Sequence, residues 1–330
     1  MDRLPLVMTM GDPAGIGPEL ALAAWRLRAA DDPPFFVLAA PGWLREVARR
    51  VGSPTPIIET RAERAASVMA TGLPVVPLDN TVAAELGRPD AANAAATVES
   101  IERAVSAVRA GSARAVVTNP IAKATLYEAG FRFPGHTEFL GELAAPWGGR
   151  AFPVMMIWSE ALAVVPVTIH IPLSEAPKAL TRDLIVETAR VVDRDLKARF
   201  RLSRPRLAVS GLNPHAGEGG AMGREEITII GPAIESLRAE GIDVIGPLPA
   251  DTMFHAKARA RYDVALTMYH DQGLIPAKTL AFDEGVNVTL GLPFVRTSPD
   301  HGTAFDIAGR GVADPTSLRA ALKLADRLTR

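Results

Sequence analysis

Residues 6–19 have the sequence Leu-Val-Met-Thr-Met-Gly-Asp-Pro-Ala-Gly-Ile-Gly-Pro-Glu, and this stretch indicates the fold class of the chain. Residues 6–10 are apolar or β-branched and predict a buried strand. Glycine and proline follow at once and predict a tight turn, after which Pro18 and Glu19 suit the first turn of a helix. A buried strand that passes through such a turn into a helix is typical of a layered α/β protein.

The glycines of this turn leave two interpretations open. Gly15-Ile-Gly17 begins like the dinucleotide fingerprint G-x-G-x-x-G, but Pro18, Glu19 and Leu20 follow, so the third glycine is absent. The segment is either a phosphate-binding loop of Rossmann type or a plain strand-to-helix turn. The missing glycine favours the plain turn.

Short apolar strands and amphipathic helices alternate through the rest of the chain. Apolar residues at helical spacing in residues 98–108 and 185–196 predict two helices that pack on a sheet. In residues 227–237 the same spacing contains Pro232, which predicts a kink or a new helix start. Further strands are predicted at residues 35–39, 115–118, 207–210, 264–268 and 286–290.

Length and composition limit the classes of protein that fit. The chain has 330 residues, 48% of them hydrophobic, which is enough for one large core or two smaller domains. Its formal net charge is −1 and both signs are interspersed, so we expect a small polar ligand and neither nucleic acid nor an anionic membrane as partner. Cysteine is absent, which excludes disulfides and thiolate chemistry and restricts any metal site to His, Asp or Glu ligands.

The best candidate for a membrane span is residues 151–174, in which Glu160 is the one charged residue. Three prolines interrupt this stretch and Trp158-Ser-Glu resembles a turn, so it predicts a buried β-hairpin. The N-terminus lacks the basic and apolar segments of a secretory signal. We therefore expect a cytoplasmic protein that does not bind membranes.

Three histidines each close an apolar stretch: His170, His215 and His270. Three imidazoles suit Zn, Co or Ni, and they leave coordination positions open for a substrate oxygen, as a catalytic metal requires. Their separations of 45 and 55 residues match no local metal motif. From spacing alone, a hydrogen-bonded histidine of the core or of a cleft edge is favoured over a metal ligand at each position.

Residues 134–139, Pro-Gly-His-Thr-Glu-Phe, have the form of a loop that enters a helix. Thr137 is a candidate N-cap, and the first-turn amides together with His136 and Thr137 could hold an oxyanion. A capped helix without a ligand is the alternative.

Lys278, Asn287 and Arg296 follow His270 closely in the sequence. An arginine among apolar residues and prolines is a natural bidentate clamp for carboxylate or phosphate. Taken singly, each of these three residues is better explained as a surface side chain.

Five longer motifs, taken together, resemble those of the 4-hydroxythreonine-4-phosphate dehydrogenase family of pyridoxal phosphate biosynthesis, the PdxA family. They occur in order, and the similarity runs from Met8 to about Ala325. The motifs are PGHTEFL at 134–140, GLNPHAGEGG with MGREE at 211–226, GPLPADT at 246–252, MYHDQG at 268–273 and VNVTLGLPFVRTSPDHGTA at 286–304.

This resemblance implies a two-lobed α/β/α fold similar to that of isocitrate and isopropylmalate dehydrogenases, with the active site in the interlobe cleft at a homodimer interface. We expect a discontinuous first lobe at 1–125 and 275–330 and a second lobe at 126–274. It also implies NAD or NADP, bound outside a G-x-G-x-x-G module by residues that the sequence does not indicate, a divalent metal (Zn, Mg or Co), and a small phosphorylated amino acid as substrate.

The resemblance also assigns roles to individual residues. The metal site is shared between two subunits, and in one division His170 comes from one chain and His215 with His270 from the other. Lys278 is the first candidate for the base and Asp251 the second. The implied metal ligands are His170, His215 and His270, and the implied substrate contacts are His136, Thr137, Lys278, Asn287 and Arg296.

The implied reaction is oxidation of the C3 hydroxyl of 4-phosphooxy-L-threonine, with hydride transfer to NAD and a metal that assists loss of the hydroxyl proton. The product, 3-amino-2-oxo-4-phosphooxybutanoate, is a β-keto acid that loses carbon dioxide to give 3-amino-2-oxopropyl phosphate, in pyridoxine 5′-phosphate biosynthesis. One alternative is a paralogous dehydrogenase of 4-phospho-threonate or 4-phospho-erythronate. Another is a metal-dependent binding or hydrolytic protein that no longer uses NAD.

Overall fold

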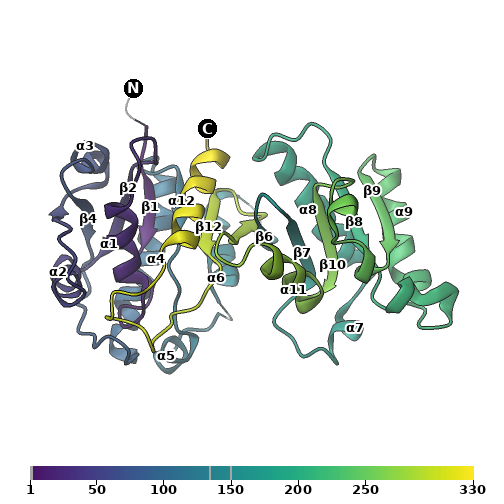
Figure 1. The fold of residues 1–330 in the computed structure, drawn as a ribbon, viewed down its shortest axis with the longest axis horizontal. Coiled ribbons are helices and arrows are strands. Elements are labelled where there is room, and N and C mark those ends of the chain that lie inside the picture. Colours follow the sequence, from purple (N-terminus) through teal and green to yellow (C-terminus); the bar gives the residue numbers. More distant parts are fainter. Residues whose placement is uncertain (1–2, 134, 149–150) are drawn as a thin grey trace. The chain divides into compact units, whose positions relative to one another are not determined.

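The computed structural model describes residues 3–133, 135–148 and 151–330, and the chain divides into two compact units (Figure 1). Unit 1 comprises Met1–Ala151 and Leu292–Arg330, and unit 2 comprises Phe152–Gly291. Unit 1 is therefore discontinuous in sequence, and both boundaries lie later in the chain than the expected positions after residues 125 and 274.

Unit 1 is built on a parallel sheet with the strand order β3-β4-β2-β1-β5-β12. From β1 the chain passes to β2 and to the edge strand β3, then to β4 between them, and it returns to β5 on the other side of β1. The loops after β1 and β5 therefore lie at a topological switch point, where ligands of open α/β sheets commonly bind. The strands are β1 (Leu6–Thr9), β2 (Phe35–Ala39), β3 (Ile57–Glu59), β4 (Leu73–Pro77), β5 (Ala115–Val117) and β12 (Val295–Pro299).

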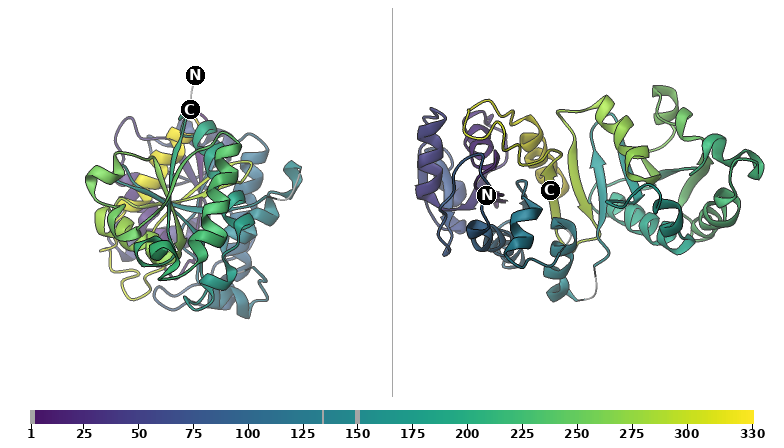
Figure 2. Two further views of the ribbon diagram at one scale, coloured as in Figure 1. Left: turned by 90° about the vertical axis from the view of Figure 1, so that its right-hand side faces the viewer. Right: turned by 90° about the horizontal axis from the view of Figure 1, so that it is seen from below.

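Helices cover both faces of this sheet, which explains why β1, β2 and β5 are buried throughout. The right-hand view of Figure 2 shows α12 on one side of the strands and α4 on the other. The helices are α1 (Gly17–Arg26), α2 (Pro41–Arg50), α3 (Ala65–Val68), α4 (Ala94–Arg109), α5 (Lys123–Glu128), α6 (His136–Leu143) and α12 (Thr316–Leu328), with 3₁₀ turns at Ala62–Arg64, Ala91–Asn93 and Ala145–Trp147.

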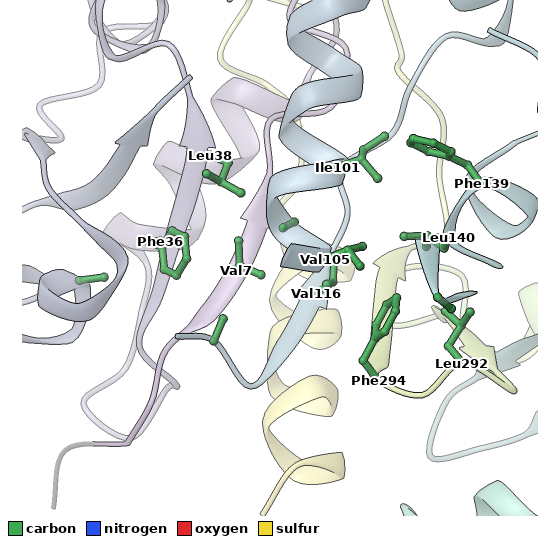
Figure 3. Packing of buried hydrophobic residues seen from close by; sticks show 14 residues of the cluster. Val7, Phe36, Leu38, Ile101, Val105, Val116, Phe139, Leu140, Leu292 and Phe294 are labelled. Atoms are coloured by element: carbon green, nitrogen blue, oxygen red, sulfur yellow. The ribbon is translucent and has the colours of Figure 1, made fainter. Parts of the chain in front are cut away.

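The core of unit 1 explains the first boundary. Phe139 and Leu140 of α6 are buried in the same cluster as Phe294 and Val116, as Figure 3 shows. Because α6 buries its apolar face in this cluster, it belongs to unit 1, although residues 126–151 were expected in the second lobe.

Unit 2 has the strand order β11-β6-β7-β10-β8-β9. Strand β6 pairs antiparallel with β11 and with β7, whereas β7, β10, β8 and β9 are parallel to one another. Pairing with β6 places β11 in unit 2, and this explains the second boundary. The strands are β6 (Val154–Trp158), β7 (Ala163–Thr168), β8 (Arg206–Ser210), β9 (Asp243–Leu248), β10 (Val264–Tyr269) and β11 (Val286–Leu290).

In unit 2, α8 and α11 lie on opposite faces of the sheet (Figures 1 and 2). The segment with Pro232 restarts as a helix: a π-helical turn, Glu226–Ile230, precedes α9, which has the proline in its first turn. The helices are α7 (Ala176–Ala179), α8 (Arg182–Ala198), α9 (Gly231–Ala239), α10 (Ala256–Arg259) and α11 (His270–Leu280), with 3₁₀ turns at Pro214–Gly220 and Ala250–Thr252.

The predicted apolar hairpin is confirmed as β6 and β7, with Ser159 in the connection between them. Within residues 3–133, 135–148 and 151–330, none of the helices combines the length and apolarity of a membrane span.

Candidate active site

His170 and His270 lie side by side in unit 2. Their strands, β7 and β10, are parallel neighbours, so the residues that follow them meet at one edge of the sheet. The two ring centroids are 5.7 Å apart, and both rings line a cavity of about 230 Å³ with Thr168, Tyr269 and Asp271. Two imidazoles that bind one ion, each at a nitrogen–metal distance of ~2.0–2.1 Å, have ring centres roughly 5 Å apart. The pair therefore fits a divalent metal.

Asp271 fixes the orientation of the His270 ring. The Nδ1 atom of His270 lies 2.7 Å from a carboxylate oxygen of Asp271. Since an ionised carboxylate only accepts hydrogen bonds, Nδ1–H is the donor in this contact, and Nε2 is the ring nitrogen left to bind a metal ion. A carboxylate partner of this kind is the usual support of a metal-binding histidine.

His215 lies on a backbone turn of unusual conformation. It belongs to the 3₁₀ turn Pro214–Gly220, in which His215, Ala216 and Glu218 have φ values of 52°, 51° and 42°. This left-handed conformation costs a non-glycine residue about 1–2 kcal/mol. His170 has φ 53° as well. Strained residues of this kind gather at functional sites.

The three histidines do not meet within one chain. His215 follows β8, the neighbour of β10, but it does not line the cavity of His170 and His270. Among the described residues, no group of three His, Cys, Asp or Glu side chains of one chain could hold a metal ion.

Arg296 provides a buried positive charge in unit 1. It lies in β12 with 3% of its surface exposed, and its Nε and Nη2 donate to the hydroxyl of Thr118 at 3.1 and 2.6 Å. Burial lowers the pKa of Arg296 to about 10, so the guanidinium stays charged at neutral pH. A guanidinium held in this way can bind a carboxylate or phosphate through two parallel hydrogen bonds.

His136 lies near this charge, at the first position of α6. Burial, Arg296 and Lys123 together hold the pKa of His136 well below 6.5, so the imidazole is neutral. Its Nε2 is buried and has no hydrogen-bond partner among residues 3–133, 135–148 and 151–330. The Lys123 ammonium also comes close to this helix end, since a Cβ on Gly135 would lie 3.6 Å from its Nζ. These groups form a receptor for an anion.

The expected N-cap of this helix is wrong. Gly135 occupies the N-cap position of α6 and no side chain caps it, whereas Thr137 is half-buried in the first turn. Packing of Phe139 against Phe131 and Phe133, with ring centroids 5.0 and 5.1 Å apart, fixes where the helix begins. The hydroxyl of Thr137 is therefore not used as a cap. Pro134, at the start of the motif, lies outside the described residues.

The remaining implied substrate contacts lie in unit 2. Asn287 in β11 has a buried Oδ1 without a hydrogen-bond partner in the part of the chain that the structure describes. Lys278 is half-buried on α11, and its ammonium lies 5.8 Å from the ring centroid of Phe282. Lys278 lies on the same helix as His270, ~12 Å further along the helix axis.

Asp251 is exposed in the 3₁₀ turn Ala250–Thr252, which contacts the turn that carries His215. The two candidates for the base thus lie on different elements.

The glycine-rich segment after β1 is a structural turn. Residues 11–20 are all buried, and a Cβ on Gly15 would lie 2.9 Å from the carbonyl oxygen of Thr303. A Cβ on Gly17 would lie 2.8 Å from the carbonyl oxygen of Met10. The glycines therefore allow parts of the chain itself to approach closely, and the segment does not fit the pyrophosphate of a dinucleotide.

Sequence analysis did not assign Thr118 and Asp271 to the site, and Lys123, in the segment after the strand predicted at residues 115–118, is from sequence only a possible cleft residue. Thr118 ends a predicted apolar strand and Asp271 follows a candidate ligand. A polar residue at the end of a strand is the sequence signal that could have assigned both to the site. The position of Lys123 beside α6 depends on packing between segments distant in sequence.

The chain matches a family model over most of its length. The model is described as the pyridoxal phosphate biosynthetic protein PdxA, and it matches residues 32–325. A protein of Methylorubrum populi named 4-hydroxythreonine-4-phosphate dehydrogenase is 62% identical over 99% of this chain and 95% of its own length. A protein of the same name from Bradyrhizobium diazoefficiens is 57% identical over 98% of this chain and 96% of its own.

Solved structures agree with these sequence matches. The crystal structure of 4-hydroxythreonine-4-phosphate dehydrogenase from Klebsiella pneumoniae is 36% identical, covers 99% of this chain and 100% of its own, and superposes with a TM-score of 0.87. A terephthalate 1,2-cis-dihydrodiol dehydrogenase from Burkholderia xenovorans is 29% identical over 98% of this chain and 97% of its own, with a TM-score of 0.63. The expected α/β fold is thereby confirmed, and the chain belongs to the family of the pyridoxal phosphate biosynthetic protein PdxA.

Proposed function

We propose that this chain is an NAD- or NADP-dependent dehydrogenase of 4-phosphooxy-L-threonine in pyridoxine 5′-phosphate biosynthesis. The observation that carries the proposal is its 62% identity, along 99% of its length, to a relative named for that activity. The chemistry of the side chains in each unit supports it, since unit 1 offers an anion receptor and unit 2 offers a pair of metal-binding imidazoles.

The anionic groups of the substrate would bind to Arg296 and to the first turn of α6. Arg296 supplies the charge, because the neighbouring His136 is neutral. Nε2 of His136 and the hydroxyl of Thr137 would contribute hydrogen bonds, and the exposed amides of a helix N-terminus favour an anion. Lys278 and the unpartnered Oδ1 of Asn287 would contact the polar groups of the substrate.

His170, His215 and His270 would hold the metal, which we expect to be Zn, Mg or Co. A divalent ion supplies a Lewis acid that favours loss of the hydroxyl proton and polarises the carbonyl formed by oxidation. Since His170 and His270 adjoin in one chain and His215 lies apart, we propose a homodimer in which this pair combines with His215 of the partner subunit.

The proton of the C3 hydroxyl would pass to Nζ of Lys278, which can accept it only as a neutral amine, with the carboxylate of Asp251 as the second candidate. The hydride on C3 passes to the nicotinamide as an electron pair with its hydrogen. The resulting β-keto acid then loses its carboxyl group as carbon dioxide, and the electron pair of that bond forms an enol that is protonated to 3-amino-2-oxopropyl phosphate. We propose that this occurs in the cytoplasm.

The substrate is tested by NADH formation from purified protein with Co²⁺ and NAD. 4-Phosphooxy-L-threonine and 4-phospho-threonate are compared at equal concentrations, since they differ in the amine. We expect the amino substrate to give the higher kcat/KM. Preference for 4-phospho-threonate, or turnover of neither compound, would overturn the proposed activity.

A further inference from the structure

The turn that carries His215 needs support from outside itself. Five consecutive residues, 215–219, have φ values between 42° and 81°, and three of them are not glycine. L-residues rarely adopt this conformation in succession, because each Cβ approaches the following carbonyl oxygen. Such a turn persists only where surrounding contacts hold it in place.

Glu226 makes the most extensive of these contacts. Its side chain is buried, and its Oε1 accepts hydrogen bonds from the backbone N–H groups of Leu212 and Asn213, both at 2.8 Å. Its Oε2 accepts a further hydrogen bond from Nδ2 of Asn213 at 3.0 Å. These donors belong to the residues directly before the turn, so the carboxylate holds the backbone in place where the turn begins.

The same carboxylate lies against the middle of the turn. A Cβ on Gly217 would lie 2.6 Å from Oε2 of Glu226, which means that the turn wraps directly around the carboxyl group. A Cβ on Gly211 would lie 2.8 Å from Cα of Ala216 and 3.1 Å from Oε1. Glycine is thus required where the backbone closes on Glu226.

The backbone around Glu226 is itself unusual. The residue opens the π-helical turn Glu226–Ile230, which precedes α9. π-Helical turns are rare and occur frequently at functional sites.

We propose that Glu226 is a positioning residue for His215: its carboxylate holds the left-handed turn so that the imidazole is presented for metal binding. The inference rests on the proposed function, since it takes His215 as a metal ligand. Glu226 itself touches neither metal nor substrate in this account. Its effect on the ion passes through the backbone of residues 212–217.

The test is Glu226→Gln, measured by titrating Co²⁺ into the metal-free dimer with calorimetry and visible absorption. Glutamine keeps the size of the side chain, but its amide nitrogen would face Nδ2 of Asn213. Two donors would then meet where the wild type has a donor and an acceptor. We expect the dissociation constant for Co²⁺ to rise about 10- to 100-fold, as loss of an outer partner of a ligand does. The absorption bands should move toward those of His215→Ala.

Two further variants complete the design. Glu235→Gln removes a charge from the exposed face of α9 and should bind Co²⁺ like the wild type. Asn213→Ala removes the bond that Nδ2 donates to Oε2 of Glu226 and the bond that it donates to Glu225 at 2.7 Å. It keeps both backbone bonds to Glu226, so it should weaken binding in the same direction but less. It also replaces Glu226→Gln as the test if that variant fails to fold.

The outcomes separate the two proposals. If His215→Ala binds Co²⁺ as tightly as the wild type, the proposed metal site is wrong. If His215→Ala binds weakly while folded Glu226→Gln and Asn213→Ala keep wild-type affinity and spectrum, Glu226 has no positioning role. A lower melting temperature with unchanged affinity counts as the same negative result.

Discussion

Arg296 combines near-complete burial with a charge that persists at neutral pH. Its planar guanidinium places two donors on the hydroxyl of Thr118, and this leaves the group in a fixed orientation. A lysine at this position would keep the charge but not the planar geometry. We therefore expect the shape of the group, more than its charge, to decide how well an anion binds.

Arg296→Lys should weaken substrate binding roughly 10- to 150-fold, which corresponds to about 1.5–3 kcal/mol for a charge-assisted hydrogen bond. The substrate dissociation constant measured by calorimetry without NAD checks this. Arg61→Lys, an exposed arginine of the same unit, serves as the control. Unchanged affinity in Arg296→Lys would count against the anion receptor.

His136 should make the protein sensitive to acid. Its pKa in the folded chain lies below the 6.5 of an exposed histidine, because of burial and of Arg296 and Lys123. Below pH 6.5 the unfolded chain takes up a proton that the folded chain does not. The free energy of unfolding therefore falls with decreasing pH, by up to about 1.4 kcal/mol per pH unit for this residue.

Urea unfolding in EDTA at several pH values compares wild type with His136→Asn. We expect the variant to lose less stability between pH 6.5 and pH 5, and the two slopes to agree above pH 7.5. Parallel curves over the whole range would show that His136 is protonated in the folded state.

Helix α6 differs from α8 in how its N-terminus is satisfied. In α8 the side chain of Thr181 is the N-cap and accepts a hydrogen bond from the N–H of Leu184 at 3.1 Å. Helix α6 has glycine at this position and no side-chain cap. Its first-turn donors remain available for a ligand, and Thr137 is free to contribute to binding.

Valine substitutions distinguish the two threonines. Thr181→Val should lower the free energy of unfolding by about 1 kcal/mol, the usual cost of a lost cap, and leave substrate affinity unchanged. Thr137→Val should change stability by less than about 0.5 kcal/mol but weaken substrate binding roughly 2- to 12-fold, as loss of a neutral hydrogen bond does. If Thr137→Val is destabilising without an effect on affinity, Thr137 is structural.

Local patterns predicted the elements well. The strands at residues 35–39 and 286–290 have the predicted bounds, because an apolar, β-branched run between turn residues is a local property. The start of α6 was not predicted, since the packing of Phe139 with Phe131 and Phe133 decides it. The same tertiary packing moved the boundary of unit 1 past this helix.

Residue types indicated the site better than its geometry. The three histidines were found because each ends an apolar stretch, but their grouping depends on the strand order β7-β10-β8, which no local pattern reveals. His170 and His270 adjoin in one chain, which favours a division that joins His270 to His170 over the expected one that joins it to His215, and both divisions stay predictions. For the glycine turn after β1, local sequence was sufficient, because the missing third glycine alone favoured the plain turn over a dinucleotide-binding loop.

The proposed shared site makes a specific prediction for mixed dimers. A dimer of one His170→Ala chain and one His215→Ala chain carries both defects in one site and keeps the other intact. It should regain up to about half of the wild-type activity, whereas each parent is inactive. A dimer of one His170→Ala and one His270→Ala chain has a defect in each site and should stay inactive.

Differently tagged chains, co-expressed and purified through both tags, provide these dimers. Recovery in the His170→Ala with His270→Ala dimer would show that these two histidines come from different chains. Absence of recovery in both mixed dimers would show that each site is built within one chain.

The most direct test of the proposed activity follows NADH and carbon dioxide together. Metal-free enzyme receives 4-phosphooxy-L-threonine and NAD, first with EDTA and then with Co²⁺ in excess over the chelator. The account predicts no product with EDTA, and with Co²⁺ equal amounts of NADH and carbon dioxide with 3-amino-2-oxopropyl phosphate as the product. NADH formation that continues in EDTA, or no NADH with Co²⁺ present, would contradict it.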